Sequence, residues 1–255
     1  MEVFLFLSTD YRGRYDMDVG KEFDQWVETG RDESMEKGHF EATMRLLHCI
    51  SSSMNSSGIS DSPSFCNKVA LDVGCGNGWA LRRFMELGGR FGYGCDLSRK
   101  MIEKAKQYES QNLEYRVGDV GVFDDGMVQK IEDLDLCLCI ESLYYHPDPQ
   151  ESLRSFYKLL NVDGYVGIMV DLYKESWGTH PWIDALDVDV HLLSIMEYRQ
   201  ILERAGFTNI RHLQFQMTSP ITAERDFTLG PYWPTYEHYQ SYRNTGSLLL
   251  FAKKN

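Results

Sequence analysis

The sequence lacks the basic residues that would balance its acidic ones. It contains 26 Lys and Arg against 38 Asp and Glu, which gives a formal net charge of −12. Tight binding to nucleic acid or to an anionic membrane needs a cationic face, so the charge argues against both kinds of partner. An acidic surface is compatible with a cationic or neutral small substrate.

Paired cysteines and long apolar segments are also lacking. The six cysteines include no Cys-x-x-Cys pair, so they predict neither a disulfide framework nor a zinc site. Cys137 and Cys139 lie two residues apart, which places both on one face of a strand. The apolar run at residues 3–7 is too short to span a bilayer, and it lacks the flanks of a signal peptide. A reducing, cytoplasmic setting is expected.

One stretch that is present, a glycine turn, organises the rest of the chain. Residues 69–73 form a short apolar run typical of a buried parallel strand, and apolar residues recur at helical spacing from Trp79 onward. Between them lie Gly74, Gly76 and Gly78. A strand that leads through glycines into a helix presents bare backbone N–H groups to a ligand, and glycine lets that ligand come close.

The segment L-D-V-G-C-G-N-G, residues 71–78, resembles motif I of class I S-adenosylmethionine (SAM)-dependent methyltransferases. Asp72, Val73 and the three glycines match the family pattern of an acidic residue, a hydrophobic residue and G-x-G-x-G. The alternative is the dinucleotide pattern G-x-G-x-x-G of a NAD-dependent oxidoreductase. Trp79 stands where that pattern has its third glycine, which makes this alternative the less favoured one.

Two further acids follow predicted strands. Asp96 ends the strand at 91–95, about twenty residues beyond the glycine turn, where nucleotide-binding sheets place an acid that accepts from ribose hydroxyls. Its other interpretation is a charge at a helix N-terminus. Gly118-Asp119-Val120 follows the strand at 113–117 and matches the family's third-strand motif, in which the acid accepts from the adenine amino group and the next residue packs on the ring.

The resemblance thus implies SAM as cofactor, S-adenosylhomocysteine as product, and no metal. It assigns the cofactor site to thirteen residues: Asp72, Gly74, Cys75, Gly76, Gly78, Asp96, Leu97, Met101, Asp119, Val120, Ile140, Glu141 and Ser142.

The loop after the strand at 135–140 reads Glu-Ser-Leu-Tyr-Tyr-His-Pro-Asp-Pro and resembles the corresponding loop of small-molecule methyltransferases. Tyr145 and His146 are the candidate catalytic residues, because a histidine there could take a proton from an acceptor hydroxyl or amine. The alternative is that both only shape the loop. The N/D-P-P-Y signature of methyltransferases acting on nucleic-acid or glutamine amino groups is absent.

The residues ahead of the glycine turn predict two amphipathic helices, around 23–27 and 40–47, separated by residues 30–39. In the family such helices cap the SAM pocket. Trp26 and His39 are candidates to close it, and the alternative is a core tryptophan and a surface histidine. We expect a helical cap and Ser-rich loop at residues 1–64. The methyltransferase core then covers 65–255, with aromatic insertions at 171–193 and 218–245.

Alternating strands and helices predict an α/β fold with a mainly parallel sheet. The resemblance covers residues 69–215 and implies a single three-layer, Rossmann-like domain with seven strands, the last one antiparallel. It implies methyl transfer to a small-molecule acceptor, either an amine or an aromatic or quinone-like hydroxyl or carbon, with no nucleic-acid or membrane partner. A non-catalytic SAM-binding regulator is the other alternative. The sequence leaves the oligomeric state open.

Overall fold

The computed structural model describes residues 9–54, 63–119 and 133–255, and the side chains from residue 19 onward. Its strands are β1 (Val69–Val73), β2 (Phe91–Asp96), β3 (Leu113–Val117), β4 (Leu136–Ile140), β5 (Tyr165–Val170), β6 (Thr208–Phe215) and β7 (Ser247–Lys253). Its helices are α1 (Thr9–Glu28), α2 (Arg31–Met54), α3 (Trp79–Glu86), α4 (Arg99–Ala105), α6 (Pro149–Leu159), α7 (Trp182–Ala185), α8 (Ile195–Ala205) and α9 (Tyr236–Thr245).

The strands form one sheet in the order β3-β2-β1-β4-β5-β7-β6. Neighbouring strands from β3 to β5 pair in parallel, and β7 pairs antiparallel with both β5 and β6. The predicted seven-stranded, mainly parallel sheet with an antiparallel last strand is confirmed. The order reverses between β1 and β4, and in such sheets ligands bind beyond the carboxyl ends of the strands at that point.

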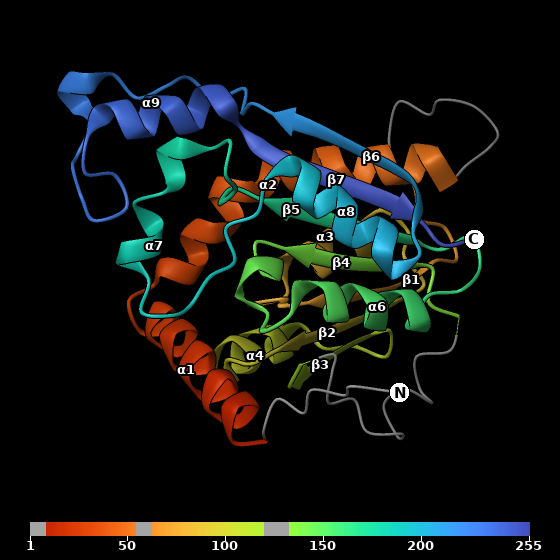
Figure 1. The fold of residues 1–255 in the computed structure, drawn as a ribbon. Coiled ribbons are helices and arrows are strands. Elements are labelled where there is room, and N and C mark those ends of the chain that lie inside the picture. Colours follow the sequence, from red (N-terminus) through yellow and green to blue (C-terminus); the bar gives the residue numbers. More distant parts are fainter. Residues whose placement is uncertain (1–8, 55–62, 120–132) are drawn as a thin grey trace, which may run out of the picture.

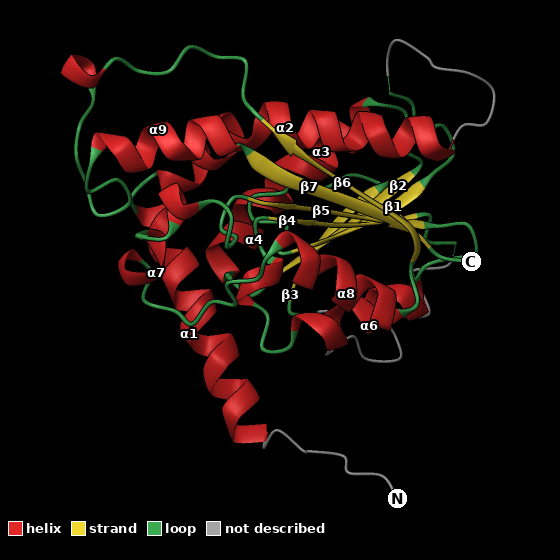
Figure 2. Cartoon of the chain, turned by 45° about the horizontal axis from the view of Figure 1, so that its top comes forward, coloured by secondary structure: helices red, strands yellow, loops and turns green. Residues whose placement is uncertain are grey.

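Helices cover both faces of the sheet. Alternate residues of β4 point to opposite sides, so Cys137 and Cys139 pack with α6 and α8, whereas Leu136 and Leu138 pack with α2 and α3. Figure 2 shows these helix pairs above and below the sheet. The prediction that the two cysteines share one face is confirmed, and both thiols are buried.

Local hydrogen bonds set several helix boundaries. Ser98 caps α4 by accepting from the Met101 N–H, and Asp148 caps α6 ahead of Pro149. Ser194 and Glu197 form a capping box at the start of α8. These caps fix where each helix begins relative to the strand before it.

The two N-terminal helices are longer than predicted. Residues 31–39 are not a linker, because α2 already begins at Arg31, and only Thr29 and Gly30 separate it from α1. Gly30 has φ +71°, and Asp32 and Glu33 lie in the first turn of α2, where carboxylates favour a helix. Helices α1, α7 and α9 gather at the carboxyl ends of the parallel strands (Figure 1).

Aromatic packing joins the two regions predicted as insertions. Trp182 of α7 contacts Trp233 at a ring-centroid distance of 5.2 Å, and Tyr242 of α9 at 5.9 Å. The domain boundaries given above stay a prediction. Within the described residues, no helix combines the length and apolar character needed to cross a membrane.

Candidate active site

The glycine turn follows β1 directly. Gly74, Gly76 and Gly78 all have positive φ, at +72°, +54° and +80°. A Cβ on Gly74 would lie 2.4 Å from the Cβ of Ser142, so this position needs glycine for space as well as for conformation. At Gly76 such a Cβ would meet only the Met101 sulfur, at 4.0 Å, among the described residues other than its chain neighbours, so the backbone there borders open space.

Asp96 at the end of β2 is tied to that turn. Its Oδ2 accepts from the Gly76 N–H at 2.8 Å, and its Oδ1 accepts from the Ser98 N–H at 2.8 Å. Burial raises the pKa of Asp96 to about 6, although these two N–H groups lower it. Each carboxylate oxygen keeps a second lone pair for a ligand hydroxyl.

Asp72 in β1 is an unusual buried acid. The residue is 1% exposed, and neither carboxylate oxygen has a hydrogen-bond partner among the described residues. Burial, and secondarily the charge of Asp96, raises the pKa of Asp72 to about 7. A buried polar group without a partner is costly, so this acid is suited to a ligand that supplies positive charge.

A pocket of about 900 Å³, measured to its open mouth, lies at the switch point of the sheet. It brings together most of the residues predicted for the cofactor and the chemistry: Asp72, Gly74, Cys75, Gly76, Asp96, Leu97, Met101, Asp119, Ile140, Glu141, Ser142, Tyr145 and His146.

Two predicted cofactor residues stand apart from this set. Gly78 does not line the pocket; a Cβ there would lie 2.5 Å from the Tyr115 ring, so packing explains its glycine. Val120 lies outside the described residues.

In the loop after β4, the polar side chains of Glu141 and Ser142 point into the protein interior. Glu141 has φ +54°, and its carboxylate accepts from the Asp171 N–H and from the Tyr144 hydroxyl. The Ser142 hydroxyl donates to the Val73 carbonyl at 2.7 Å. Both residues line the pocket, but the protein itself engages their polar atoms.

The hydrogen-bond partners of His146 allow one tautomer of its ring to be assigned. Its Nδ1 lies 2.8 Å from the Ser152 hydroxyl oxygen, and that hydroxyl donates its only hydrogen to the Asp148 carbonyl. We therefore assign the hydrogen of the imidazole to Nδ1, which leaves Nε2 as an acceptor. Burial lowers the pKa of His146, so the ring is neutral at pH 7.

Tyr145 joins this loop to the N-terminal cap. Its ring packs edge-on against Phe23 of α1 at a centroid distance of 5.1 Å, and burial raises the pKa of its hydroxyl. Tyr145 therefore forms part of the aromatic boundary between loop and cap.

The cap supplies pocket residues that sequence reasoning missed. Val19 and Phe23 line the pocket with Trp26, and their i, i+4, i+7 spacing is the signal that could have found them. The Arg31 guanidinium lies 3.7 Å from the centre of a Trp26 ring and 3.8 Å from that of Tyr232. This stack joins Trp26 of α1 to Tyr232 of the region predicted as an insertion at 218–245.

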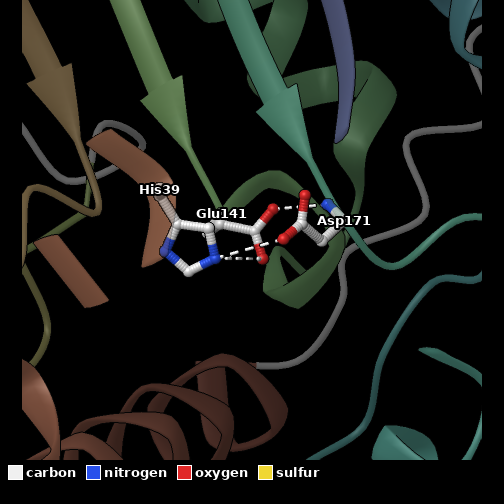
Figure 3. Close-up of side chains that lie close together, drawn as sticks. All are labelled: His39, Glu141 and Asp171. Carbon is white, nitrogen blue, oxygen red and sulfur yellow. Dashed lines mark hydrogen bonds and ion pairs between the residues drawn. The ribbon is translucent and has the colours of Figure 1, made fainter. Parts of the chain in front are cut away.

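His39 is buried, with 8% of its surface exposed, so the interpretation as a surface histidine is wrong. It is not among the described residues that line the pocket, and it lies instead beside Glu141 and Asp171 (Figure 3). Burial lowers the pKa of His39, but the bond to Asp171 and both carboxylate charges raise it overall, to about 9. Burial and then the Asp171 charge raise the pKa of Glu141 to about 8.

Comparisons with known proteins find similarity to methyltransferases. A family model described as a methyltransferase domain matches residues 71–168. The ubiquinone biosynthesis O-methyltransferase of Neisseria meningitidis is 30% identical over 105 residues, which cover 40% of this chain and 43% of that protein. The tRNA U34 carboxymethyltransferase of Helicobacter pylori is 27% identical over 173 residues, which cover 64% and 66%. The chain thus spans less than half the length of the first of these relatives.

Solved structures extend the similarity to most of the chain. A chain from the complex between the Haloferax volcanii Trm112 methyltransferase activator and a methyltransferase is 27% identical, with a TM-score of 0.74, covering 91% of this chain and 96% of that one. The N-methyltransferase NodS of Bradyrhizobium japonicum, solved with S-adenosylhomocysteine, is 16% identical with a TM-score of 0.54, covering 84% and 86%. At that identity it shows the fold alone.

Residues 71–168 match a methyltransferase domain, and the fold is that of class I SAM-dependent methyltransferases. SAM is the cofactor of this family, and the pocket fits it. The unpartnered oxygens of Asp72 suit the positive charge of SAM, and Gly76 leaves room beside the turn for a ligand. The roles of the individual residues stay predictions.

Proposed function

We propose that this methyltransferase acts on a small-molecule acceptor, either an amine or an aromatic or quinone-like hydroxyl or carbon. The observation that carries the proposal is the apolar and aromatic lining that the N-terminal helices give to the pocket. There Val19, Phe23 and Trp26 of α1 and Met35 of α2 line the same pocket as the glycine turn. A pocket wall of apolar and aromatic side chains suits a small acceptor that enters whole. The net charge of −12 disfavours nucleic acid.

In this proposal the chain's own groups hold the cofactor from three sides. The glycine turn holds the methionine part of SAM, Asp96 accepts from the ribose hydroxyls, and Asp72 neutralises positive charge. When bound, SAM supplies a methyl group carried on a sulfonium. Transfer requires acceptor atom, carbon and sulfur in line, so the enclosing walls contribute chiefly by positioning.

In the assigned tautomer, His146 has the lone pair that a general base needs. With its Nδ1 hydrogen donated to Ser152, the Nε2 lone pair is left to take a proton from an acceptor hydroxyl or ammonium. Its lowered pKa keeps that lone pair available at neutral pH. Tyr145 would pack against the acceptor beside it. The alternative that both residues only shape the loop makes the opposite prediction for activity.

The test is a screen for release of S-adenosylhomocysteine with phenols, quinols, small amines and unmodified tRNA as acceptors. We expect turnover with at least one small molecule and none with tRNA. His146→Gln should lower that turnover by about 10²-fold or more, the contribution of a general base, without changing SAM affinity. His212→Gln, at an exposed histidine on β6, is the matched control. Activity on tRNA alone would overturn the small-molecule proposal, and full activity of His146→Gln would leave the loop-shaping alternative.

We also propose, as a second candidate, a protein partner of the Trm112 type. What supports it is the similarity to a chain of the Haloferax complex over nearly the full length of both chains. Gel filtration of this chain with purified Haloferax Trm112 tests it. A co-eluting complex is expected, and separate elution at micromolar concentrations would contradict the proposal.

A further inference from the structure

Three metal-ligating side chains converge behind the wall of the pocket. His39 comes from α2, Glu141 follows β4 and Asp171 follows β5, and their side chains point toward one another (Figure 3). All three residues are at least nine-tenths buried. One nitrogen or oxygen from each lies within 4.8 Å of those of the other two.

The His39 ring presents a lone pair to the two carboxylates. Its Nδ1 lies 2.9 Å from the Met35 carbonyl oxygen, which can only accept, so Nδ1 carries a hydrogen. Nε2 then faces Asp171 Oδ2 at 3.2 Å and Glu141 Oε2 at 3.9 Å. In the neutral ring these are three acceptors facing one another, and they repel unless a cation lies between them. That cation is either a proton on Nε2 or a metal ion.

The two carboxylates are fixed in position by neighbouring groups. The Tyr144 hydroxyl donates to Glu141 Oε2 at 2.8 Å, and the Tyr242 hydroxyl donates to Asp171 Oδ2 at 2.7 Å. The Asp171 N–H donates to the other oxygen of Glu141. Metal sites hold their ligands in this way, with the far nitrogen of the histidine on a carbonyl and the carboxylates hydrogen-bonded from outside.

Charge and ligand type together select the class of cation. When ionised, the two carboxylates carry a charge of −2, which a divalent ion compensates fully. Without an ion, the raised pKa values of His39 and Glu141 mean that protons on both groups compensate it instead. Ligand atoms about 2.0–2.2 Å from an ion lie about 3–3.5 Å from one another, so 3.2 Å fits and 3.9 Å needs a small closure. Imidazole nitrogen with carboxylate oxygens suits Zn²⁺, Co²⁺ or Mn²⁺, whereas Mg²⁺ prefers oxygen ligands alone.

We propose that His39, Glu141 and Asp171 bind one divalent transition-metal ion. The ion would connect α2 of the cap to the ends of two central strands. Glu141 also lines the pocket, so the ion would stiffen that wall without taking part in methyl transfer. This proposal does not depend on the identity of the acceptor.

Metal binding can be measured directly on the full chain. After dialysis against a chelator, the protein is titrated calorimetrically with Co²⁺, Zn²⁺, Mn²⁺ and Mg²⁺ at pH 7. We expect one Co²⁺ or Zn²⁺ per chain, a rise in melting temperature with the ion, and no comparable binding of Mg²⁺. The visible absorption of Co²⁺ reports its ligands, and absence of thiolate charge-transfer bands excludes binding at a cysteine.

Two variants locate the ion. His39→Gln should weaken Co²⁺ binding by about 100-fold or more, since loss of a group that merely orients a ligand already costs 10–100-fold. His212→Gln should bind as the wild type does. If wild-type protein binds no stoichiometric ion, a proton holds the cluster and the proposal fails, whether or not the variants fold. Unchanged binding in His39→Gln would place the ion elsewhere and would also overturn it.

Discussion

Replacing Asp72 by Asn should change how the stability of the unliganded protein depends on pH. The carboxyl is buried without a partner among the described residues, and its pKa rises from 3.8 to about 7 in the folded state. The folded protein therefore keeps a proton that the unfolded chain loses above pH 4. Its stabilising effect is fully present below pH 3.8 and is lost as the pH rises to about 7.

The size of this effect follows from the same values. Between pH 5 and pH 7 the folded state holds one extra proton, and each pH unit is worth 1.36 kcal/mol, so the loss is about 3 kcal/mol. Asn has a similar shape and does not titrate. Whatever its own burial costs, that cost is the same at both pH values and cancels in the comparison.

The assay is urea unfolding of wild type and Asp72→Asn at pH 5 and pH 8, followed by circular dichroism. The difference in unfolding free energy should shift by about 3 kcal/mol in favour of Asn at pH 8. Asp187→Asn, at an exposed carboxylate, controls for general charge effects. A wild-type-minus-variant difference that does not change with pH would refute the raised pKa of Asp72.

Two further substitutions test the packing around the pocket. Gly74→Ala should destabilise the protein by about 2–4 kcal/mol in urea unfolding, because it combines a positive φ with a contact 2.4 Å from Ser142. Gly38→Ala, in open space within α2, should instead stabilise it by about 0.5–1 kcal/mol; equal effects would contradict the steric explanation. Arg31→Ala removes a cation stacked between two rings and should cost about 1–2 kcal/mol. An unchanged unfolding curve for Arg31→Ala would show that the stack does not hold the cap.

Much of the fold follows from local sequence patterns. The apolar run at 69–73 and the glycines after it predict β1 and its turn, because a buried strand and positive φ values need those residue types. Ser98 predicts the start of a helix through a hydrogen bond within one turn. Such features depend on residues close in sequence, so they can be found without a structure.

The cluster of His39, Glu141 and Asp171 could be predicted only in part. Glu141 and Asp171 each follow one of two neighbouring parallel strands. Their proximity could therefore be predicted once those strands were paired. The approach of His39 depends on how α2 packs across the sheet, about 100 residues away in sequence from Glu141. No local pattern encodes that packing. The stack of Arg31 between Trp26 and Tyr232 could not be predicted from the sequence for the same reason.

The most direct test of the central claim is calorimetric titration with SAM, S-adenosylhomocysteine and NAD. We predict micromolar binding of both adenosyl ligands and none of NAD. Asp96→Ala should weaken SAM binding by about 1.5–3 kcal/mol, the range for losing hydrogen bonds to a charged group. Binding of NAD alone would contradict the cofactor assignment, and unchanged SAM affinity in a folded Asp96→Ala variant would contradict the ribose contact.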